Sequence, residues 1–292
     1  MKTPNFMVGP PGTGKTSEFI TKKYKELLTK YSHTKIIIWS HTNVAADEIR
    51  DEILKLPEVK EKGLTKKSFK YKIGTIHSYC KSKALSRDVF SYEDHINLCR
   101  KESEFKLQRI SASDFESNQH KFYKYLSDAF GRGMTLEEHW KTCNRNSYKP
   151  YSLNVIKEMQ GKYEKYKKDN HVCDFDDMIK DFIDKAKEPD IDALIVDEAQ
   201  DSNIPQTKAL DKMATNTKEY WFVGDPDQTI FEFAGASAET FYKLSKGAKE
   251  IEQGHRCGQT INNLCKQIIK PIWDHYDTHR IWKPANYKKG HE

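Results

Sequence analysis

Short apolar runs that end in polar residues recur along the chain, and each of them predicts a β-strand followed by a loop. The runs cover residues 5–8, 35–40, 71–78, 191–196 and 220–223, and a further short strand is expected just before residue 251. The run at 35–40 is apolar over almost its whole length, as expected for a parallel strand buried on both faces. Open α/β sheets bind ligands at the carboxyl ends of their strands, so the polar residues that follow are binding-site candidates.

Apolar residues at helical spacing lie between these runs. Residues 16–30 predict a helix that carries Phe19, Ile20, Leu27 and Leu28 on one side. From about residue 85 to residue 170, glycine becomes rare and aromatic residues recur. One apolar stripe in that region consists of Val155, Met159, Tyr163 and Tyr166. We therefore predict a helical insertion between two strands of the sheet, with a small core of its own.

Three charged stretches each have two interpretations. Residues 60–72 hold six lysines against Glu61, which favours a solvated surface over direct contact with nucleic acid. The tyrosines and lysines of residues 161–168 could stack on a single strand and neutralise it, but an amphipathic helix is preferred. Carboxylates at 174–177 open another predicted helix and complement its dipole, whereas a metal site built from Asp174, Asp176 and Asp177 is the less favoured alternative.

The composition is that of a polar and mildly basic chain. Of the 292 residues, 37% are hydrophobic and 32% are charged, and the formal net charge is +6. No apolar run approaches the ~20 residues that span a bilayer, so we expect no membrane partner. The cysteines are scattered and form no C-x-x-C pair, which favours reduced thiols over a metal site or disulfide framework. The positive charge is compatible with a nucleic-acid partner.

The strongest chemical signal follows the first apolar run. It fits the phosphate-binding pattern G-x-x-x-x-G-K-[ST] and consists of Gly9, Pro10, Pro11, Gly12, Thr13, Gly14, Lys15 and Thr16. The glycines let backbone N–H groups point at phosphate oxygens, Lys15 suits the β- and γ-phosphates, and the Thr16 hydroxyl suits Mg²⁺. The pattern predicts a bound nucleoside triphosphate. Because so few residues precede it, we expect no signal peptide and a location in the cytoplasm of a bacterial cell or a phage-infected host.

Two later strands end in residues that would complete such a site. The run at 191–196 leads into Asp197, which would hold Mg²⁺, and Glu198, which would orient and deprotonate the attacking water. The run at 220–223 leads to Gln228, whose amide could touch the γ-phosphate or that water. Phe231 and Phe233 follow, and they would stack on bases if exposed or belong to the core if buried. Residues 251–256 supply the guanidinium of Arg256.

The ordered set of motifs resembles the UvrD/Rep family of superfamily 1 DNA helicases. The matching segments are GPPGTGKT (9–16), SHTNVAADEI (40–49), GTIHSYC (74–80), DFDDMI (174–179), DEAQD (197–201), VGDPDQTIFEFAGA (223–236) and EQGHRC (252–257). Their order and spacing fit the family as far as about residue 265. The resemblance implies an α/β fold, in which a RecA-like P-loop NTPase parallel sheet (1–84 and 171–266) is interrupted by a helical insertion domain (85–170). Residues 267–292 would then begin a second motor domain or form a tail.

The resemblance also implies ATP and Mg²⁺ as cofactors and assigns roles to residues. Lys15 and Thr16 would hold phosphate and Mg²⁺, Asp197 the metal, Glu198 the water, and Gln228 and Arg256 the γ-phosphate. His255 occupies the place of a tyrosine that stacks on adenine. Positions that touch single-stranded DNA in the family correspond to Thr42, Asn43, His77 and Phe233, to which His41 and Phe231 are added as stacking candidates. The family moves 3′-to-5′ along one strand, which implies a 3′-tailed duplex as substrate.

Thr42 and Asn43 have a second interpretation, because short polar residues before a helix commonly cap it. The chain also departs from the family pattern. It lacks the upstream glutamine that reads adenine, His41 replaces the usual aromatic residue, and Ala234 replaces a common arginine. No counterpart of the later motifs is present up to Glu292, including a second arginine for the γ-phosphate.

Three functions fit these observations. The leading one is the N-terminal, ATP-binding half of a DNA helicase, which needs a separate or missing second motor domain to move. The second is an ATP-liganded, single-stranded nucleic-acid-binding module without efficient turnover, which has no need of Glu198. The third is an ATPase switch that acts on protein partners, against which the DNA-facing residues argue. An RNA substrate stays open, because nothing in the sequence indicates how a 2′-hydroxyl would be read.

Overall fold

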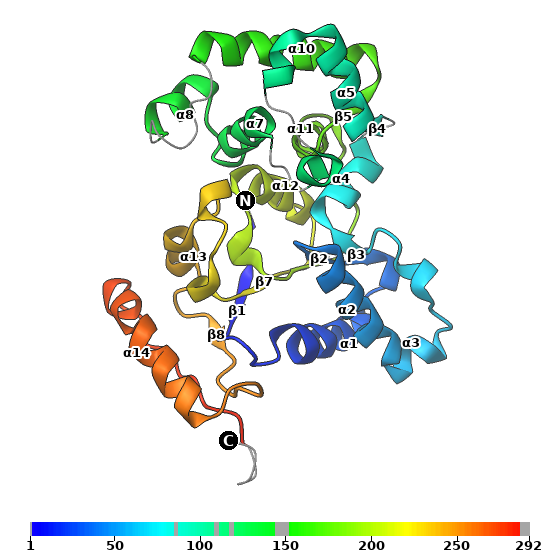
Figure 1. Cartoon of the computed structure of the whole chain (residues 1–292). Helices are drawn as coiled ribbons and strands as arrows, with labels where there is room; N and C mark the ends of the chain where they lie inside the picture. The colour runs from blue at the N-terminus through cyan, green and yellow to red at the C-terminus, as the bar shows by residue number, and fades with distance from the viewer. Residues whose placement is uncertain (1, 85–86, 108–110, 117–119, 144–151, 287–292) are drawn as a thin grey trace.

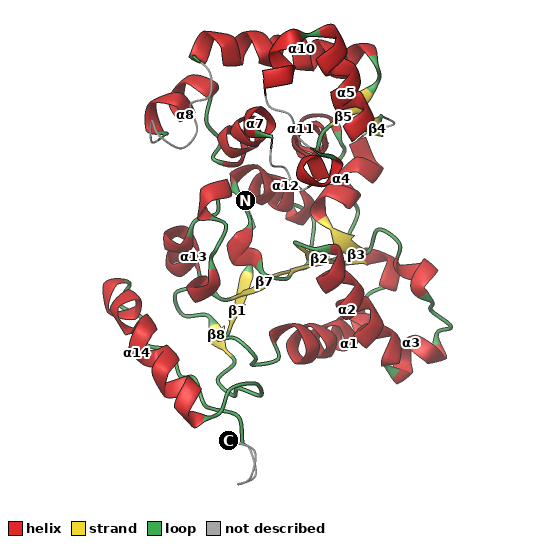
Figure 2. Ribbon diagram, in the orientation of Figure 1, coloured by secondary structure: helices red, strands yellow, loops and turns green. Residues whose placement is uncertain are grey.

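The computed structural model describes residues 2–84, 87–107, 111–116, 120–143 and 152–286. A six-stranded sheet lies at its centre (Figures 1 and 2). The strands, in spatial order, are β3 (Ile73–Thr75), β2 (Ile36–Ser40), β6 (Ala193–Val196), β7 (Glu219–Gly224), β1 (Asn5–Val8) and β8 (Lys249–Glu250). Every neighbouring pair is parallel, so all the carboxyl ends meet at one edge. The predicted α/β fold with a parallel sheet is confirmed.

Helices cover both faces of this sheet, which explains why its strands are apolar throughout. Alternate residues of β2 belong to two separate core clusters, with Ile37 and Trp39 in one and Ile36 and Ile38 in the other. The first face is covered by α4 (Ile76–Ala84), α11 (Phe175–Lys185), α12 (Ile204–Ala214) and α13 (Ala238–Leu244). The second is covered by α1 (Thr21–Lys30), α2 (Asn43–Lys55) and α3 (Pro57–Glu61).

A helical layer lies above the sheet, between α4 and α11 along the chain (Figure 1). It contains α5 (Tyr92–Lys101), α6 (Ala112–Glu116), α7 (Lys121–Gly131), α8 (Leu136–Thr142) and α10 (Leu153–Asp169). At its base, β4 (Asp88–Val89) pairs in parallel with β5 (Val172–Cys173). Its aromatic-rich core is separate from both sheet clusters. Tyr163 and Tyr166 are buried in that core, which confirms the amphipathic-helix interpretation of residues 161–168.

The last described elements lie beside the edge of the sheet formed by β8 (Figure 1). They are α14 (Gln259–His275) and residues 276–286, hereafter the C-terminal segment. The side chains of Trp273 in α14 and Trp282 in the C-terminal segment are buried. The predicted boundary at residue 267 falls inside α14, the boundary at residue 85 falls outside the described residues, and the domain limits stay a prediction.

Two predicted elements differ from the structure. The strand predicted over 71–78 is limited to Ile73–Thr75, because Ile76, Tyr79 and Cys80 are spaced for one face of a helix and bury there. The helix predicted over 16–30 begins with a π-helical turn, η1 (Lys15–Ile20), before α1. Short 3₁₀ segments complete the fold: η2 (His33–Lys35), η3 (Lys66–Phe69), η4 (Ser103–Leu107), η5 (Ala199–Asp201), η6 (Pro226–Gln228) and η7 (Glu232–Ala234). Among the described helices, none combines the length and apolarity needed to cross a membrane.

Candidate active site

The glycine-rich loop leaves the carboxyl end of β1 and leads into η1. Its entry is fixed to the sheet by the Gly9 amide, which donates to the Gly224 carbonyl of β7 at 3.3 Å. Gly12 and Gly14 have φ values of +71° and +78°, a region that side chains disfavour. Lys15 is buried, and its ammonium donates to the carbonyl of Gly9 at 2.8 Å across the concave side of the loop. The loop therefore has the shape and the cation that a phosphate group needs.

A cleft of about 910 Å³ opens in front of this loop. Its lining includes four side chains that the sequence assigned to one nucleotide site although they lie far apart in the chain: Lys15, Glu198, Gln228 and Arg256. His255 lines the same cleft. From α2, the lining includes Glu48, Asp51, Glu52 and Lys55, which the sequence patterns did not single out. The parallel sheet brings these segments to one edge, as predicted for ligand binding.

Thr16 and Asp197 meet beneath the cleft. The Thr16 hydroxyl lies 3.3 Å from both carboxylate oxygens of Asp197. Burial raises the pKa of the Asp197 carboxyl to about 7, and the neighbouring Glu198 charge adds to the shift. A hydroxyl and a carboxylate are hard oxygen donors of the kind that Mg²⁺ prefers beside phosphate and water. These two residues therefore fit a magnesium ion.

Glu198 is held in a left-handed conformation, with φ +50° and ψ +40°. Gln200 fixes its side chain, because the Gln200 amide nitrogen donates to Glu198 Oε2 at 3.0 Å. The amide oxygen of the same Gln200 accepts from the backbone N–H of Asp225 at 3.1 Å. Asp225 in turn accepts a hydrogen bond from the Gln228 side chain at 2.5 Å. One buried glutamine thus connects the carboxyl ends of β6 and β7.

The loop that carries His255 and Arg256 packs against the phosphate loop. The His255 amide donates to the Gly12 carbonyl at 2.7 Å. A Cβ atom added to Gly12 would lie 2.5 Å from Cβ of Arg256. Arg256 therefore reaches the cleft from the side of Gly12, and only glycine leaves room for it there.

The first group of predicted DNA-contacting residues surrounds the start of α2 and α4. Thr42 caps α2, since its hydroxyl accepts from the Ala45 amide at 3.1 Å, so the capping interpretation is confirmed. Asn43 is exposed beside it. Desolvation lowers the pKa of the partly exposed His41 and His77 to about 4, and for His41 the neighbouring His77 adds to the shift, so both rings are neutral at pH 7. These two histidines therefore offer ring faces and not positive charge.

The second group is exposed after η6. Phe231 and Phe233 are 38% and 52% exposed, with ring centroids 5.8 Å apart, and the Lys124 ammonium lies 5.7 Å from the Phe233 ring. Exposure excludes the interpretation of these aromatics as core residues. Ser202, directly after η5 (Ala199–Asp201), contacts the first group, because its Oγ is 3.3 Å from Nε2 of His41.

The sequence patterns missed Phe175, the first residue of α11. Its side chain is 59% exposed, and its ring centroid lies 5.5 Å from that of His77. The sequence signal was its place in the DFDDMI segment (174–179), whereas its exposure and its proximity to His77 appear only in the structure. Phe175 extends the first group of stacking candidates.

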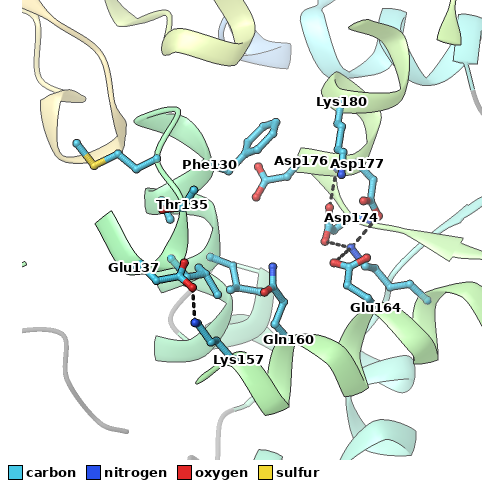
Figure 3. Close-up of a pocket in the computed structure, with 15 residues that line it drawn as sticks. Phe130, Thr135, Glu137, Lys157, Gln160, Glu164, Asp174, Asp176, Asp177 and Lys180 are labelled. Carbon is cyan, nitrogen blue, oxygen red and sulfur yellow. Dashed lines mark hydrogen bonds and ion pairs between the residues drawn. The ribbon is translucent and has the colours of Figure 1, made fainter. Parts of the chain in front are cut away.

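The acidic cluster at the start of α11 has a structural role. Asp174 caps the helix and pairs with the buried ammonium of Lys167 at 2.7 Å, while Asp177 pairs with the same ammonium at 2.9 Å. Figure 3 shows Asp174, Asp176 and Asp177 at the wall of a cleft of about 620 Å³ that α7, α8 and α10 of the helical layer form with α11. Across the described residues, no group of three or more His, Cys, Asp or Glu side chains could hold a metal ion. The structure therefore favours helix capping over a metal site.

The sheet order and the loop after β1 define a RecA-like phosphate-loop fold. Residues 1–249 match the family described as UvrD/REP helicase N-terminal domain, and the chain belongs to that family. A probable DNA helicase II homolog of Mycoplasma genitalium is 26% identical over 295 residues, which cover 92% of this chain and 41% of the relative. The ATP-dependent DNA helicase PcrA of Staphylococcus aureus is 24% identical over 296 residues, which cover 91% and 38%. The chain thus spans less than half of the length of these relatives.

Proposed function

We propose that this chain is the N-terminal, ATP-binding half of an ATP-dependent DNA helicase or translocase. The observation that carries the proposal is the single cleft that Lys15, Glu198, Gln228 and Arg256 line together. Membership in the helicase family supports the same function. The proposal includes 3′-to-5′ movement and a 3′-tailed DNA substrate, both of which rest on the resemblance.

Each side chain in the cleft has a distinct task in the proposed reaction. Lys15 and the glycine-rich loop bind the phosphates, and Arg256 and Gln228 contact the γ-phosphate. Glu198 orients the attacking water and accepts its proton, a role that its fixed hydrogen bond from Gln200 supports. His255 lies at the mouth of the cleft, where its ring can stack on the base.

Thr16 and Asp197 would hold Mg²⁺ beside the phosphates. When bound, the ion would neutralise charge that develops on the transferred phosphoryl group. The short distance between the Thr16 hydroxyl and the buried Asp197 carboxylate supports this assignment.

Single-stranded DNA would lie across the carboxyl edge of the sheet. The exposed rings of Phe175, Phe231 and Phe233 supply stacking faces there. The partly exposed rings of His41 and His77 would add two more. Stacking of this kind contributes ~1–3 kcal/mol per base and tolerates any sequence. Thr42 and Asn43 would contact the backbone of the strand.

A second motor domain is the proposed partner of α14. The helix exposes an apolar stripe that consists of Ile261, Leu264, Ile268 and Ile272. An apolar stripe of this length on a soluble chain indicates a surface that another element covers. The greater length of the relatives supports a second domain, as a continuation of the chain or as a separate subunit.

Steady-state ATP hydrolysis by the purified chain, with and without single-stranded DNA, tests the proposal. We expect DNA-stimulated turnover that Lys15→Ala abolishes, because the substitution removes the phosphate-binding ammonium. Binding of ATP with little or no turnover would instead indicate a catalytically incomplete half, whose site needs the second motor domain. An ATP hydrolysis rate that does not change when DNA is added would contradict the helicase assignment and favour an ATPase switch that acts on protein partners.

A further inference from the structure

A buried ion pair connects the C-terminal segment to the nucleotide cleft. Arg280 Nη1 donates to Asp225 Oδ1 at 2.8 Å, and the two side chains are 3% and 0% exposed. The second oxygen of the same carboxylate, Oδ2, accepts the hydrogen bond from the Gln228 amide. Asp225 therefore stands between Arg280 and Gln228, and its Oδ1 also accepts the backbone N–H of Asp227 at 3.1 Å.

The neighbouring contacts restrict how this ion pair can move. Trp273 of α14 donates to Asp227 at 2.9 Å, Tyr242 of α13 also donates to Asp227, and the Arg280 guanidinium lies 3.6 Å from its carboxylate. The ring of Tyr276 stacks on that of Tyr242, with centroids 4.2 Å apart. The short turn that carries Gln228 is thus held by side chains from α13, α14 and the C-terminal segment.

The same segment also supports the loop that carries Arg256. The Lys283 amide donates to the Glu252 carbonyl at 2.7 Å, and the Gly254 amide donates back to the Lys283 carbonyl at 2.9 Å. The Ala285 amide donates to the Cys257 carbonyl at 2.8 Å. Backbone pairing therefore flanks Arg256 on both sides. Both γ-phosphate contacts assigned to this chain depend on residues that follow α14.

We propose that Arg280 is a positioning residue: it holds Asp225, and Asp225 in turn holds Gln228 toward the γ-phosphate. The C-terminal segment that carries Arg280 also supports the loop of Arg256. This inference rests on the proposed nucleotide site and names a residue that no motif contains. The group that Gln228 and Arg256 would contact is the terminal phosphate of a nucleoside triphosphate. A diphosphate does not reach Gln228 or Arg256, so its binding should not depend on Arg280.

The test compares the dissociation constants of fluorescent ADP and of a fluorescent, non-hydrolysable ATP analogue. In Arg280→Gln, we expect the preference for the triphosphate to fall about 10-fold, the effect of losing a hydrogen bond to a charged group, while ADP affinity stays the same. The triphosphate preference of Arg280→Lys should lie between that of the wild type and that of Arg280→Gln. Lys270→Gln removes an equal charge from α14, where its partner Asp274 is exposed, and should change neither constant.

Arg280→Gln leaves the buried Asp225 carboxylate without its ionic partner and could prevent folding. The double variant Asp225→Asn/Arg280→Met removes both charges and should retain the wild-type melting temperature, yet it should still lose the triphosphate preference. A folded variant that keeps the preference overturns the inference and leaves the proposed function intact. A wild-type chain that binds both nucleotides equally also contradicts it, and one that binds neither refutes the proposed function as well.

Discussion

At the scale of single residues, Gly12 combines a backbone constraint with a steric one. Its φ of +71° places it in the left-handed region, and its missing Cβ leaves the space that Arg256 occupies. Gly63 has a similar φ of +64°, but nothing lies within 4 Å of a Cβ added there. The two glycines therefore separate the effect of backbone strain from the effect of a steric clash.

We expect Gly12→Ala to weaken triphosphate binding by at least about 10-fold, because the new methyl group displaces Arg256. Gly63→Ala is the matched control. Both substitutions should lower the free energy of unfolding by about 1–2 kcal/mol through left-handed strain, but Gly63→Ala should leave nucleotide affinity unchanged. Isothermal titration and urea unfolding measure the two quantities. Equal nucleotide affinities in the two variants would show that Arg256 does not need the space.

At the scale of elements, the sequence predicted what depends on periodicity and motif order. The strand β2 was evident from its isoleucine run, and the amphipathic α10 was evident from the spacing of Met159 and Tyr163. The start of α4 was missed because Thr75, His77 and Ser78 are polar and resemble a turn, although Ile76 and Tyr79 already have helical spacing. Arg280 could not be found, because its role depends on a contact with Asp225, 55 residues away in the chain.

The helical layer contains a buried histidine, His120, that makes its stability depend on pH. His120, directly before α7, is buried beside His95, and burial together with that neighbour lowers its pKa to about 4. The unfolded chain binds a proton at His120 near its ordinary pKa of 6.5. Between pH 6.5 and pH 4, the unfolded state therefore holds more protons than the folded state, and stability falls as the pH falls.

His120→Phe should remove this contribution and keep the aromatic packing with Tyr123. From pH 6.5 downward, the free energy of unfolding of the wild type should decrease faster than that of the variant, by up to about 1.4 kcal/mol per pH unit. Above pH 7 the two curves should run parallel. His279→Phe changes an exposed histidine and serves as the control. Urea unfolding at pH 5, 6 and 7.5 measures the difference, and identical slopes would contradict the assignment.

At the scale of the whole molecule, the chain enters and leaves the helical layer at one place, and α7 also contacts η7, where Arg132 donates to the Glu232 and Phe233 carbonyls. The chain leaves through β4 and returns through β5, and these two short strands pair with each other. The layer has its own core cluster, separate from the two that enclose the sheet. A structural unit of this kind can be removed if its ends are rejoined.

We expect a chain in which a short Gly–Ser linker replaces residues 91–170 to fold and to bind the fluorescent ATP analogue as the full chain does. The reason is that the cleft takes its lining from outside that range. Affinity for single-stranded DNA should also be largely retained, because Phe175, Phe231 and Phe233 remain. Circular dichroism and nucleotide titration test this expectation. An unfolded product would show that the sheet needs the helical layer for its stability.

The ion pair between Arg280 and Asp225 has a thermodynamic consequence for any partner that binds α14. Coupling free energies between two sites are reciprocal. If displacement of α14 draws Arg280 away from Asp225, then a partner that displaces it must lower triphosphate affinity by some factor. The triphosphate must lower the affinity of that partner by the same factor. A partner that holds α14 in place would instead gain affinity when ATP is bound and lose it after hydrolysis, so a single buried arginine would suffice to link the nucleotide cycle to association.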